Sequence, residues 1–265
     1  MTKSVDAMDE RVERWMHALE ARQLADLTFQ EVSRALRALS STYVERRGKL
    51  AEGAALSGAG KRAAFALFYG PLHLLLIRAI VRELGAPFTT VSTVIDLGCG
   101  TGASGAGWAL ACEKPPRVSG VDRHPWAIDE ARRTHADLGL RADLRVHDMT
   151  RVSLVGRGGR AAGADVRKTG VLLAFAVNEL QDAAARDALL RQLLAWRDAG
   201  GHVLVVEPLA GFVAPWWGEW CRAVEAAGGR ADEWRFRQRL PAIVEKLDRA
   251  AGLNHRELKA RSLAL

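Results

Sequence analysis

The stretch VSTVIDLGCGTGASG, residues 91–105, places an acid, Asp96, near the end of a short β-branched run. Four closely spaced glycines follow this acid: Gly98, Gly100, Gly102 and Gly105. A buried strand that leads through a glycine-rich turn into a helix can serve three purposes: a phosphate cradle, a nucleoside pocket, or only a tight connection. The acid helps to distinguish these three interpretations.

The glycine pattern alone is weak evidence, whereas Asp96 is informative. Residues 100–105 fit GxGxxG, the fingerprint of dinucleotide-binding sites. A dinucleotide site holds pyrophosphate with backbone N–H groups, and a carboxylate beside it would repel that anion. A carboxylate can instead hold a cationic ligand, which the glycines allow the backbone to approach closely. Asp96, together with the lack of an evident second catalytic domain, therefore disfavours a nicotinamide-dependent oxidoreductase.

Short apolar runs alternate with helical patterns along the rest of the chain. The expected strands are residues 93–99, 117–124, 142–149, 170–180, 202–208, 232–240 and 256–265. The expected helices between and after them are residues 104–112, 125–139, 183–199, 215–228 and 241–252. This order predicts an α/β fold with a doubly wound, mostly parallel, seven-stranded Rossmann-like sheet. Such a sheet binds ligands beyond the carboxyl ends of its strands.

The region before the sheet has a helical period throughout. Residues 5–84 repeat apolar side chains three and four positions apart, with a glycine-rich break at 51–61. Gly70-Pro71 predicts the start of a new helix, because proline suits the first helical turn. We therefore expect an N-terminal helical cap over residues 1–90 and a catalytic domain over residues 91–265. Within that domain, residues 156–170 are expected to form a mobile surface loop.

DLGCGTG resembles the first motif of the class I S-adenosylmethionine-dependent methyltransferases, D-x-G-x-G-x-G. The resemblance covers about residues 91–210 and implies S-adenosyl-L-methionine as the cofactor. It implies that Asp122, in GVDRH, binds the ribose hydroxyls and that Asp148, in RVHDM, addresses the adenine amino group. The candidate cofactor-binding residues are therefore Asp96, Gly98, Cys99, Gly100, Gly102, Asp122, Arg123, Asp148 and Met149.

A narrower similarity concerns NELQDAAARDALLRQLLAW and GGHVLVVEPLAG, which resemble the ribosomal small-subunit methyltransferase-like proteins. Those proteins often carry a downstream cysteine cluster for metal or iron–sulfur binding. This chain has only Cys99, Cys112 and Cys221, without a CxxC pair, so no metal site and no disulfide framework is predicted. A ribosome- or rRNA-associated methyltransferase, or a non-catalytic methyltransferase-like assembly factor, is therefore the alternative function.

Polar side chains near the expected carboxyl edge are the catalytic candidates: Tyr69, His73, Asn178, Glu179 and Glu207. A general base assists methyl transfer when the acceptor is a hydroxyl or an ammonium. Each candidate also has a structural interpretation, such as a helix N-cap for Asn178, a salt bridge for Glu207 or a hydrogen-bonded core histidine for His73.

Charge and hydropathy limit the partners of the protein. The net charge of +7 is dispersed without a basic run, which slightly favours a small-molecule acceptor and leaves RNA or the ribosome possible. No apolar stretch approaches the roughly 18 residues of a membrane span, and the charged N-terminus does not resemble a secretory signal. We therefore expect a soluble, cytoplasmic protein without membrane contact, whose oligomeric state the sequence leaves open. The tryptophans at 216, 217 and 220 are expected to anchor a helix to the sheet rather than to stack on a substrate.

Overall fold

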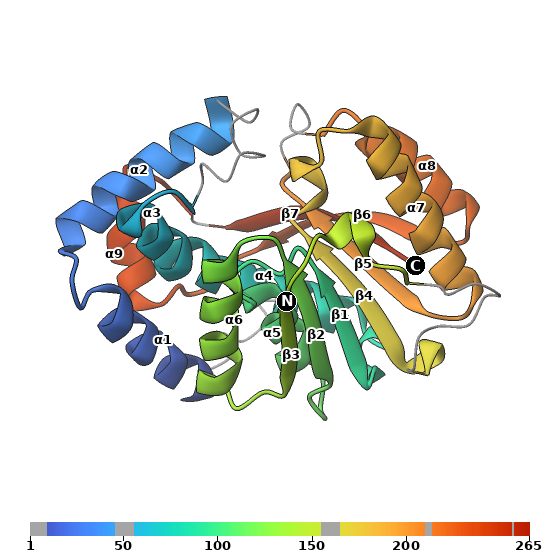
Figure 1. Cartoon of the computed structure of the whole chain (residues 1–265), viewed down its shortest axis with the longest axis horizontal. Coiled ribbons are helices and arrows are strands. Elements are labelled where there is room, and N and C mark those ends of the chain that lie inside the picture. The colour runs from blue at the N-terminus through green and yellow to red at the C-terminus, as the bar shows by residue number, and fades with distance from the viewer. Residues whose placement is uncertain (1–9, 46–55, 155–164, 210–213, 256) are drawn as a thin grey trace.

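A seven-stranded mixed sheet organises the chain, as the sequence predicts (Figure 1). The computed structural model describes residues 10–45, 56–154, 165–209, 214–255 and 257–265. The strand order is β3-β2-β1-β4-β5-β7-β6. The strands are β1 (Thr93–Leu97), β2 (Arg117–Asp122), β3 (Ala142–Val146), β4 (Thr169–Ala174), β5 (His202–Glu207), β6 (Arg230–Phe236) and β7 (Leu258–Ala264).

The first five strands are parallel to one another. The last strand, β7, pairs antiparallel with both β5 and β6. The switch in strand order lies between β1 and β4, which pair in parallel. The final strand β7 inserts antiparallel between β5 and β6, so that Glu207 of β5 lies beside Arg261 of β7. In an open sheet of this kind, the crevice at the carboxyl ends of the strands near the switch point is the ligand-binding position.

Helices cover both faces of the sheet. In Figure 1, α1, α2, α3 and α9 lie to the left of the strands and α7 and α8 lie to the right. The helices that follow β1 are α5 (Ala103–Ala111), α6 (Pro125–Asp137), α7 (Ala183–Asp198), α8 (Trp217–Ala226) and α9 (Ala242–Ala250). The N-terminal helices are α1 (Glu10–Gln23), α2 (Phe29–Glu45), α3 (Ala59–Ala64) and α4 (Gly70–Leu84). Short helical segments complete the described chain: η3 (Phe65–Tyr69), η4 (Phe88–Thr90), η5 (Met149–Arg151), η6 (Val166–Lys168) and η7 (Val177–Glu179).

The alternation of side chains along β5 divides the core between the two faces. Val203 and Val205 pack with the α7 and α8 side chains, whereas Leu204 and Val206 pack with α4, α5 and α9. The second of these clusters also contains α1 and α2 residues such as Trp15 and Leu36. The cap and the sheet domain therefore share one apolar core, and the division at residue 90 stays a prediction.

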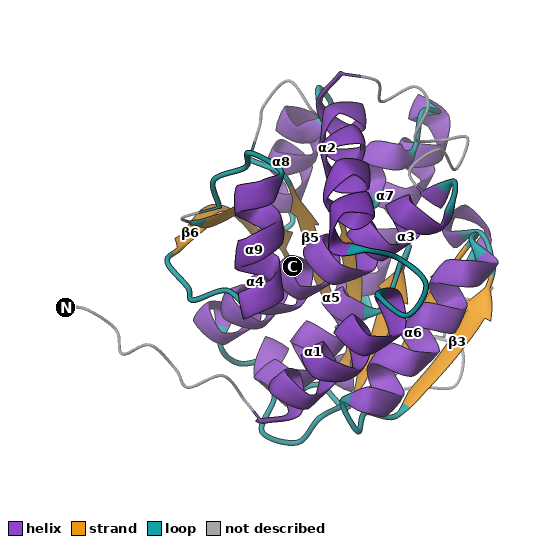
Figure 2. Ribbon diagram, turned by 90° about the vertical axis from the view of Figure 1, so that its left-hand side faces the viewer, coloured by secondary structure: helices purple, strands orange, loops and turns teal. Residues whose placement is uncertain are grey.

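Two buried contacts explain how closely the cap is held. In α5, a Cβ atom built at Gly107 would lie 2.5 Å from the Leu74 carbonyl oxygen, so only glycine permits this approach of α4. In α1, the Arg22 guanidinium donates to the fully buried Glu130 carboxylate of α6 at 2.7 Å. Arg22 also donates to Asp137 at 3.2 Å. Figure 2 shows α1 and α6 side by side on the face toward the viewer.

Helix α4 begins at Gly70 with Pro71 in its first turn, as the sequence predicts, but no break separates it from the helix before it. Helix α3, the π-helical segment η3 and α4 form one continuous run from Ala59 to Leu84. Proline has no N–H to donate and its ring crowds the preceding turn. The π turn relieves this conflict, since the Gly70 N–H bonds to the Phe65 carbonyl five residues earlier.

This run also corrects the expectation about apolar length. Its 26 residues reach a hydropathy of 1.8 and are long and apolar enough to cross a membrane by those two measures. However, 72% of its most apolar window is buried inside the protein, which is also typical of the core helix of a soluble protein. Of the expected surface loop 156–170, residues 156–164 lie outside the described residues. Its last part forms η6 and the first residues of β4.

Candidate functional site

The glycine turn after β1 has the backbone conformation that its sequence requires. Gly98, Gly100 and Gly102 have φ values of 74°, 52° and 76°, in the left-handed region that favours glycine. A Cβ at Gly98 would lie 2.7 Å from the Ala176 Cβ and 3.2 Å from the Met149 Sδ. The turn is therefore packed between the ends of β3 and β4, and its glycines permit that approach.

Asp96 lies directly beneath this turn with 1% of its surface exposed. Its Oδ2 accepts a hydrogen bond from the Gly105 N–H at 3.0 Å, and its buried Oδ1 has no partner among the described residues. The pKa of Asp96 is raised to about 7, mainly by burial; the Gly105 N–H opposes the shift and the nearby Asp122 adds to it. An unpartnered carboxylate oxygen below the turn fits a cationic ligand, held directly or through water.

Asp122 ends β2 and holds the turn in place. Its Oδ2 accepts from the Gly100 N–H at 3.0 Å, and its Oδ1 accepts from the His124 N–H at 2.8 Å. Each carboxylate oxygen can accept a further hydrogen bond, so the residue retains capacity for hydroxyl donors. Asp122 is only half-buried, whereas Asp96 is fully enclosed.

Among the remaining predicted cofactor residues, Asp148 and Arg123 lie at or beyond the ends of strands, whereas the Cys99 side chain is buried in an apolar cluster. Asp148 caps η5 by accepting from the Thr150 N–H at 2.9 Å, and it lies in the field of the exposed Arg123 at the end of β2. Cys99 points the other way, since a Cβ at Gly120 would lie 3.1 Å from its Sγ. The Cys99 side chain belongs to an apolar cluster, so its thiol is used in packing.

Glu207 at the end of β5 organises the turn that follows β4. It is fully buried, and its Oε1 accepts from the Asn178 backbone N–H at 3.2 Å. Its Oε2 accepts from the Asn178 side-chain amide. Burial raises the pKa of Glu207 to about 8, opposed by the N–H groups of Asn178 and Val177. The Asn178 Oδ1 is buried and has no partner among the described residues.

Glu179 follows Asn178 in the same turn and interacts electrostatically with Asp122. The pKa of Glu179 is raised to about 7, mainly by burial; the Asp122 charge adds to the shift and Arg123 opposes it. The structure thus brings Glu179 from beyond β4 into the electrostatic field of Asp122 from beyond β2. A carboxyl group with a pKa near neutrality can exchange a proton at physiological pH.

Tyr69 and His73 lie in an aromatic cluster on the cap side. The His73 ring stacks on Phe175 with centroids 4.2 Å apart, and burial lowers the pKa of His73 to about 3. Burial raises the pKa of Tyr69 to about 12, and the Ser40 side chain hydrogen-bonds to it. His73 is therefore a neutral packed ring and Tyr69 a neutral phenol at physiological pH.

Two residues of this cluster escaped the sequence analysis. Phe175 has a φ of 59°, which is uncommon for a bulky residue and is found where surrounding structure enforces it. Phe65, in the π turn, would lie 3.7 Å from a Cβ at Gly100, so it covers the glycine turn. The sequence offers no signal for the Phe175 backbone, and Phe65 resembles any core aromatic.

The tryptophans after β5 have the anchoring role that their spacing predicts. Trp216, Trp217 and Trp220 are buried in the cluster that joins α8 to the sheet. The Arg261 guanidinium lies over the Trp217 ring at 4.3 Å, an arrangement that the sequence analysis did not foresee.

Comparison with known proteins gives matches for this sequence and for this fold. Residues 94–201 match a family described as "Methyltransferase domain". No curated protein matches the chain. Among solved structures, the mitomycin 7-O-methyltransferase MmcR aligns with a TM-score of 0.50 and 16% identity, covering 94% of this chain and 71% of that one. The N-methyltransferase NodS from Bradyrhizobium japonicum, in complex with S-adenosyl-L-homocysteine, aligns with a TM-score of 0.45 and 14% identity, covering 71% and 83%. A Pyrococcus abyssi tRNA (uracil-54, C5)-methyltransferase aligns with a TM-score of 0.41 and 17% identity, covering 71% and 37%.

Proposed function

We propose that this chain, whose residues 94–201 form a class I S-adenosylmethionine-dependent methyltransferase domain, transfers a methyl group to an oxygen or nitrogen of a small or medium acceptor. The observation that carries the proposal is the set of three carboxyl groups around one glycine turn. Asp96 and Glu179 are each electrostatically coupled to Asp122. Such a concentration of acid attracts a cation and repels a diphosphate.

The residues of the turn fit the cofactor S-adenosyl-L-methionine. The Asp96 Oδ1, which has no partner among the described residues, can accept a hydrogen bond from a positively charged ligand. Asp122 can accept hydrogen bonds from the ribose hydroxyls. Asp148, at the end of β3, is proposed to accept from the adenine amino group. When bound, this cofactor supplies a methyl group that its sulfonium charge has already activated. Catalysis by the protein is then mainly alignment of the acceptor.

Glu179 is the proposed general base among the five catalytic candidates. Its pKa of about 7 suits removal of a proton from an acceptor hydroxyl or ammonium. Glu207 uses both carboxylate oxygens to hold Asn178, so we assign it to positioning the turn. His73 and Phe175 are proposed to exclude water from the cap side, because their rings are stacked and uncharged.

A small or medium acceptor is proposed because the cap lies so close to the glycine turn. Phe65 would be 3.7 Å from a Cβ at Gly100, and the Gly70 position is 3.5 Å from the Thr101 Oγ1 by the same measure. The fold over 94% of the chain, cap included, is also found in a protein named as an O-methyltransferase.

Calorimetry with S-adenosylmethionine and with NAD tests the donor. We expect S-adenosylmethionine to bind and NAD to give no heat of binding, because the carboxylates repel pyrophosphate. Binding of NAD in preference to the sulfonium compound would overturn the proposal.

A second experiment tests the acceptor. Methyl-labelled S-adenosylmethionine is incubated with the protein and separate panels of phenols, small amines and a ribosomal RNA fragment. Label in a phenol or amine supports the proposal. Label in RNA alone would overturn the acceptor assignment and leave the methyl donor unaffected.

A further inference from the structure

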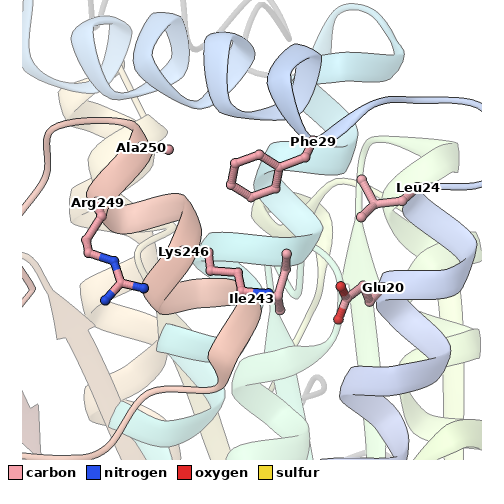
Figure 3. Close-up of a pocket in the computed structure, with 7 residues that line it drawn as sticks. All are labelled: Glu20, Leu24, Phe29, Ile243, Lys246, Arg249 and Ala250. Carbon is pink, nitrogen blue, oxygen red and sulfur yellow. The ribbon is translucent and has the colours of Figure 1, made fainter.

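A shallow groove lies on the cap between α1, the start of α2 and α9 (Figure 3). None of the described residues that line it belongs to the glycine turn. Its main part has a volume of about 660 Å³. Leu24, Phe29 and Ile243 supply its apolar floor, and Glu20, Lys246 and Arg249 line it as well. In Figure 3 the α9 side chains come from one side and those of α1 from the other, with Phe29 pointing in from α2.

A second hollow of about 280 Å³ extends the groove along α2. It shares Phe29 and Ala250 with the first hollow, so the two form one continuous depression, which we call the cap groove. Its additional cations are Arg34 and Arg37, both exposed on α2. Phe29 thus lies at the middle of the cap groove, where the two hollows meet.

The cap groove has a positive rim on both sides. Arg34 and Arg37 stand on α2, whereas Lys246 and Arg249 are exposed on α9. Within the described part of the chain, Arg37, Lys246 and Arg249 form no ion pair. Among the described residues that line either hollow, Glu20 is the only acid. These cations are therefore available to an external anionic partner, and their positions on opposite walls would let them meet charges on both flanks of it.

We propose that the cap groove binds an acidic amphipathic helix of a partner protein. An aliphatic floor accepts the apolar stripe of a helix, with anchors three and four residues apart. The basic rims pair with acidic residues on either side of that stripe. Single-stranded RNA fits less well, because it binds through successive aromatic platforms and the cap groove offers only Phe29 among aliphatic neighbours. This inference goes beyond the proposed methyl transfer and does not depend on it.

The test uses the full chain and a fluorescein-labelled peptide of about 18 residues, long enough to form a helix. The peptide carries leucines at helical spacing and glutamates elsewhere. A scrambled peptide of the same composition removes the apolar stripe, and an oligouridylate of about 12 nucleotides provides the RNA arm. Binding is measured by fluorescence anisotropy at about 0.15 M salt. We expect the amphipathic peptide to bind and both controls to bind at least about tenfold more weakly, a difference of about 1.4 kcal/mol.

Two charge-matched double variants locate the binding site. Lys246→Glu with Arg249→Glu changes the cap groove, whereas Lys114→Glu with Arg117→Glu makes the same charge change at two exposed positions, one before β2 and one at its first residue. We expect the first pair to weaken peptide binding at least about tenfold, as like charges then face each other, and the second to leave it within about twofold. Unchanged thermal unfolding and unchanged S-adenosylmethionine binding in both variants show that fold and donor site are intact.

Four outcomes would overturn the proposal. They are the absence of peptide binding, equal binding of the scrambled peptide, and equal weakening by the two double variants. The fourth is occupation by another partner: RNA binding that requires Lys246 and Arg249, or a dimer of this chain that the same substitutions dissociate. If the wild-type protein binds no S-adenosylmethionine, that result would contradict the proposed function but not the cap-groove proposal.

Discussion

Glu207 at the end of β5 accepts hydrogen bonds from both the backbone and the side-chain nitrogen of Asn178, in the turn after β4. This pairing links the carboxyl ends of two adjacent parallel strands. It leaves the Asn178 Oδ1 as a buried acceptor without a partner among the described residues. We therefore propose that Glu207 positions the turn and that Glu179 carries the proton transfer.

Replacing Glu207 separates this positioning role from acid–base chemistry. Glu207→Gln keeps the shape, and Asn178 can rotate its amide so that Oδ1 accepts from the new amide; we expect the fold and activity to be retained. Glu207→Ala leaves buried donors unpaired, and we expect a loss of about 1–3 kcal/mol of stability. Urea unfolding of both variants measures the difference. Equal damage from Gln and Ala would contradict the assignment.

The same residue predicts a dependence of stability on pH. The folded-state pKa of Glu207 is raised to about 8 from 4.5, so the folded protein retains a proton that the unfolded chain releases. Its contribution to stability is complete below about pH 4.5 and is lost as the pH rises through about 8. Glu207→Gln should therefore flatten the decline of unfolding free energy across this window. An unaltered pH profile would show that other groups cause the decline.

Cofactor binding should release protons through Glu179. The sulfonium charge favours the ionised carboxylate, and the pKa of about 7 places Glu179 partly protonated near neutral pH. We expect S-adenosylmethionine to release more protons than S-adenosylhomocysteine, whose sulfur is uncharged. Glu179→Gln should reduce that difference. Calorimetry in buffers of different ionisation enthalpy measures it, and equal release by the two ligands would refute the electrostatic argument.

Asp122→Ala should weaken S-adenosylmethionine binding by about 10- to 100-fold, since hydrogen bonds to a charged group contribute about 1.5–3 kcal/mol. The loss has two origins, because the same carboxylate holds Gly100. Asp129→Ala on the exposed face of α6 is the matched control, and its binding should match wild type. Calorimetry checks both. Unchanged affinity in Asp122→Ala would refute the ribose assignment.

Trp217→Ala should cost stability rather than cofactor binding. Trp217 is 9% exposed and packs from the first turn of α8 against the Arg261 guanidinium, so its truncation should lower the unfolding free energy by about 3 kcal/mol. Trp126→Ala, at a half-buried position on α6, should cost less. Urea unfolding and calorimetry distinguish the two effects. A large drop in S-adenosylmethionine affinity without a change in stability would place Trp217 in the site.

Two glycine-to-alanine changes should have opposite signs. At Gly107 the new Cβ would meet the Leu74 carbonyl oxygen at 2.5 Å, so α4 must move away and we expect destabilisation. At Gly218, in α8, the nearest atom would be 3.8 Å away. There we expect a gain of about 0.4–1 kcal/mol from reduced unfolded-state entropy. Thermal unfolding measures both, and a stabilised Gly107→Ala would contradict the close helix contact.

Much of the site could be predicted from local sequence. The strand, the glycine turn and the helix at residues 91–105 follow from β-branched residues and from glycines that tolerate positive φ. Asp122 was found because an acid ends the next strand. Gly70-Pro71 marks the start of α4, as predicted, but no sequence signal reveals the π turn that joins α4 to the preceding helix without a break.

The sequence by itself determined the order of strands and helices and the acid beneath the glycine turn, because these depend on short-range periodicity and backbone preference. Only the tertiary structure decided which carboxyl groups already accept hydrogen bonds at both oxygens, as Glu207 does, and which keep an oxygen without a partner among the described residues, as Asp96 does. Glu207 and Asn178 are 29 residues apart, and His73 stacks on a phenylalanine beyond the end of another strand. Such pairings, and the pKa changes that burial imposes on them, arise only when distant segments exclude water together.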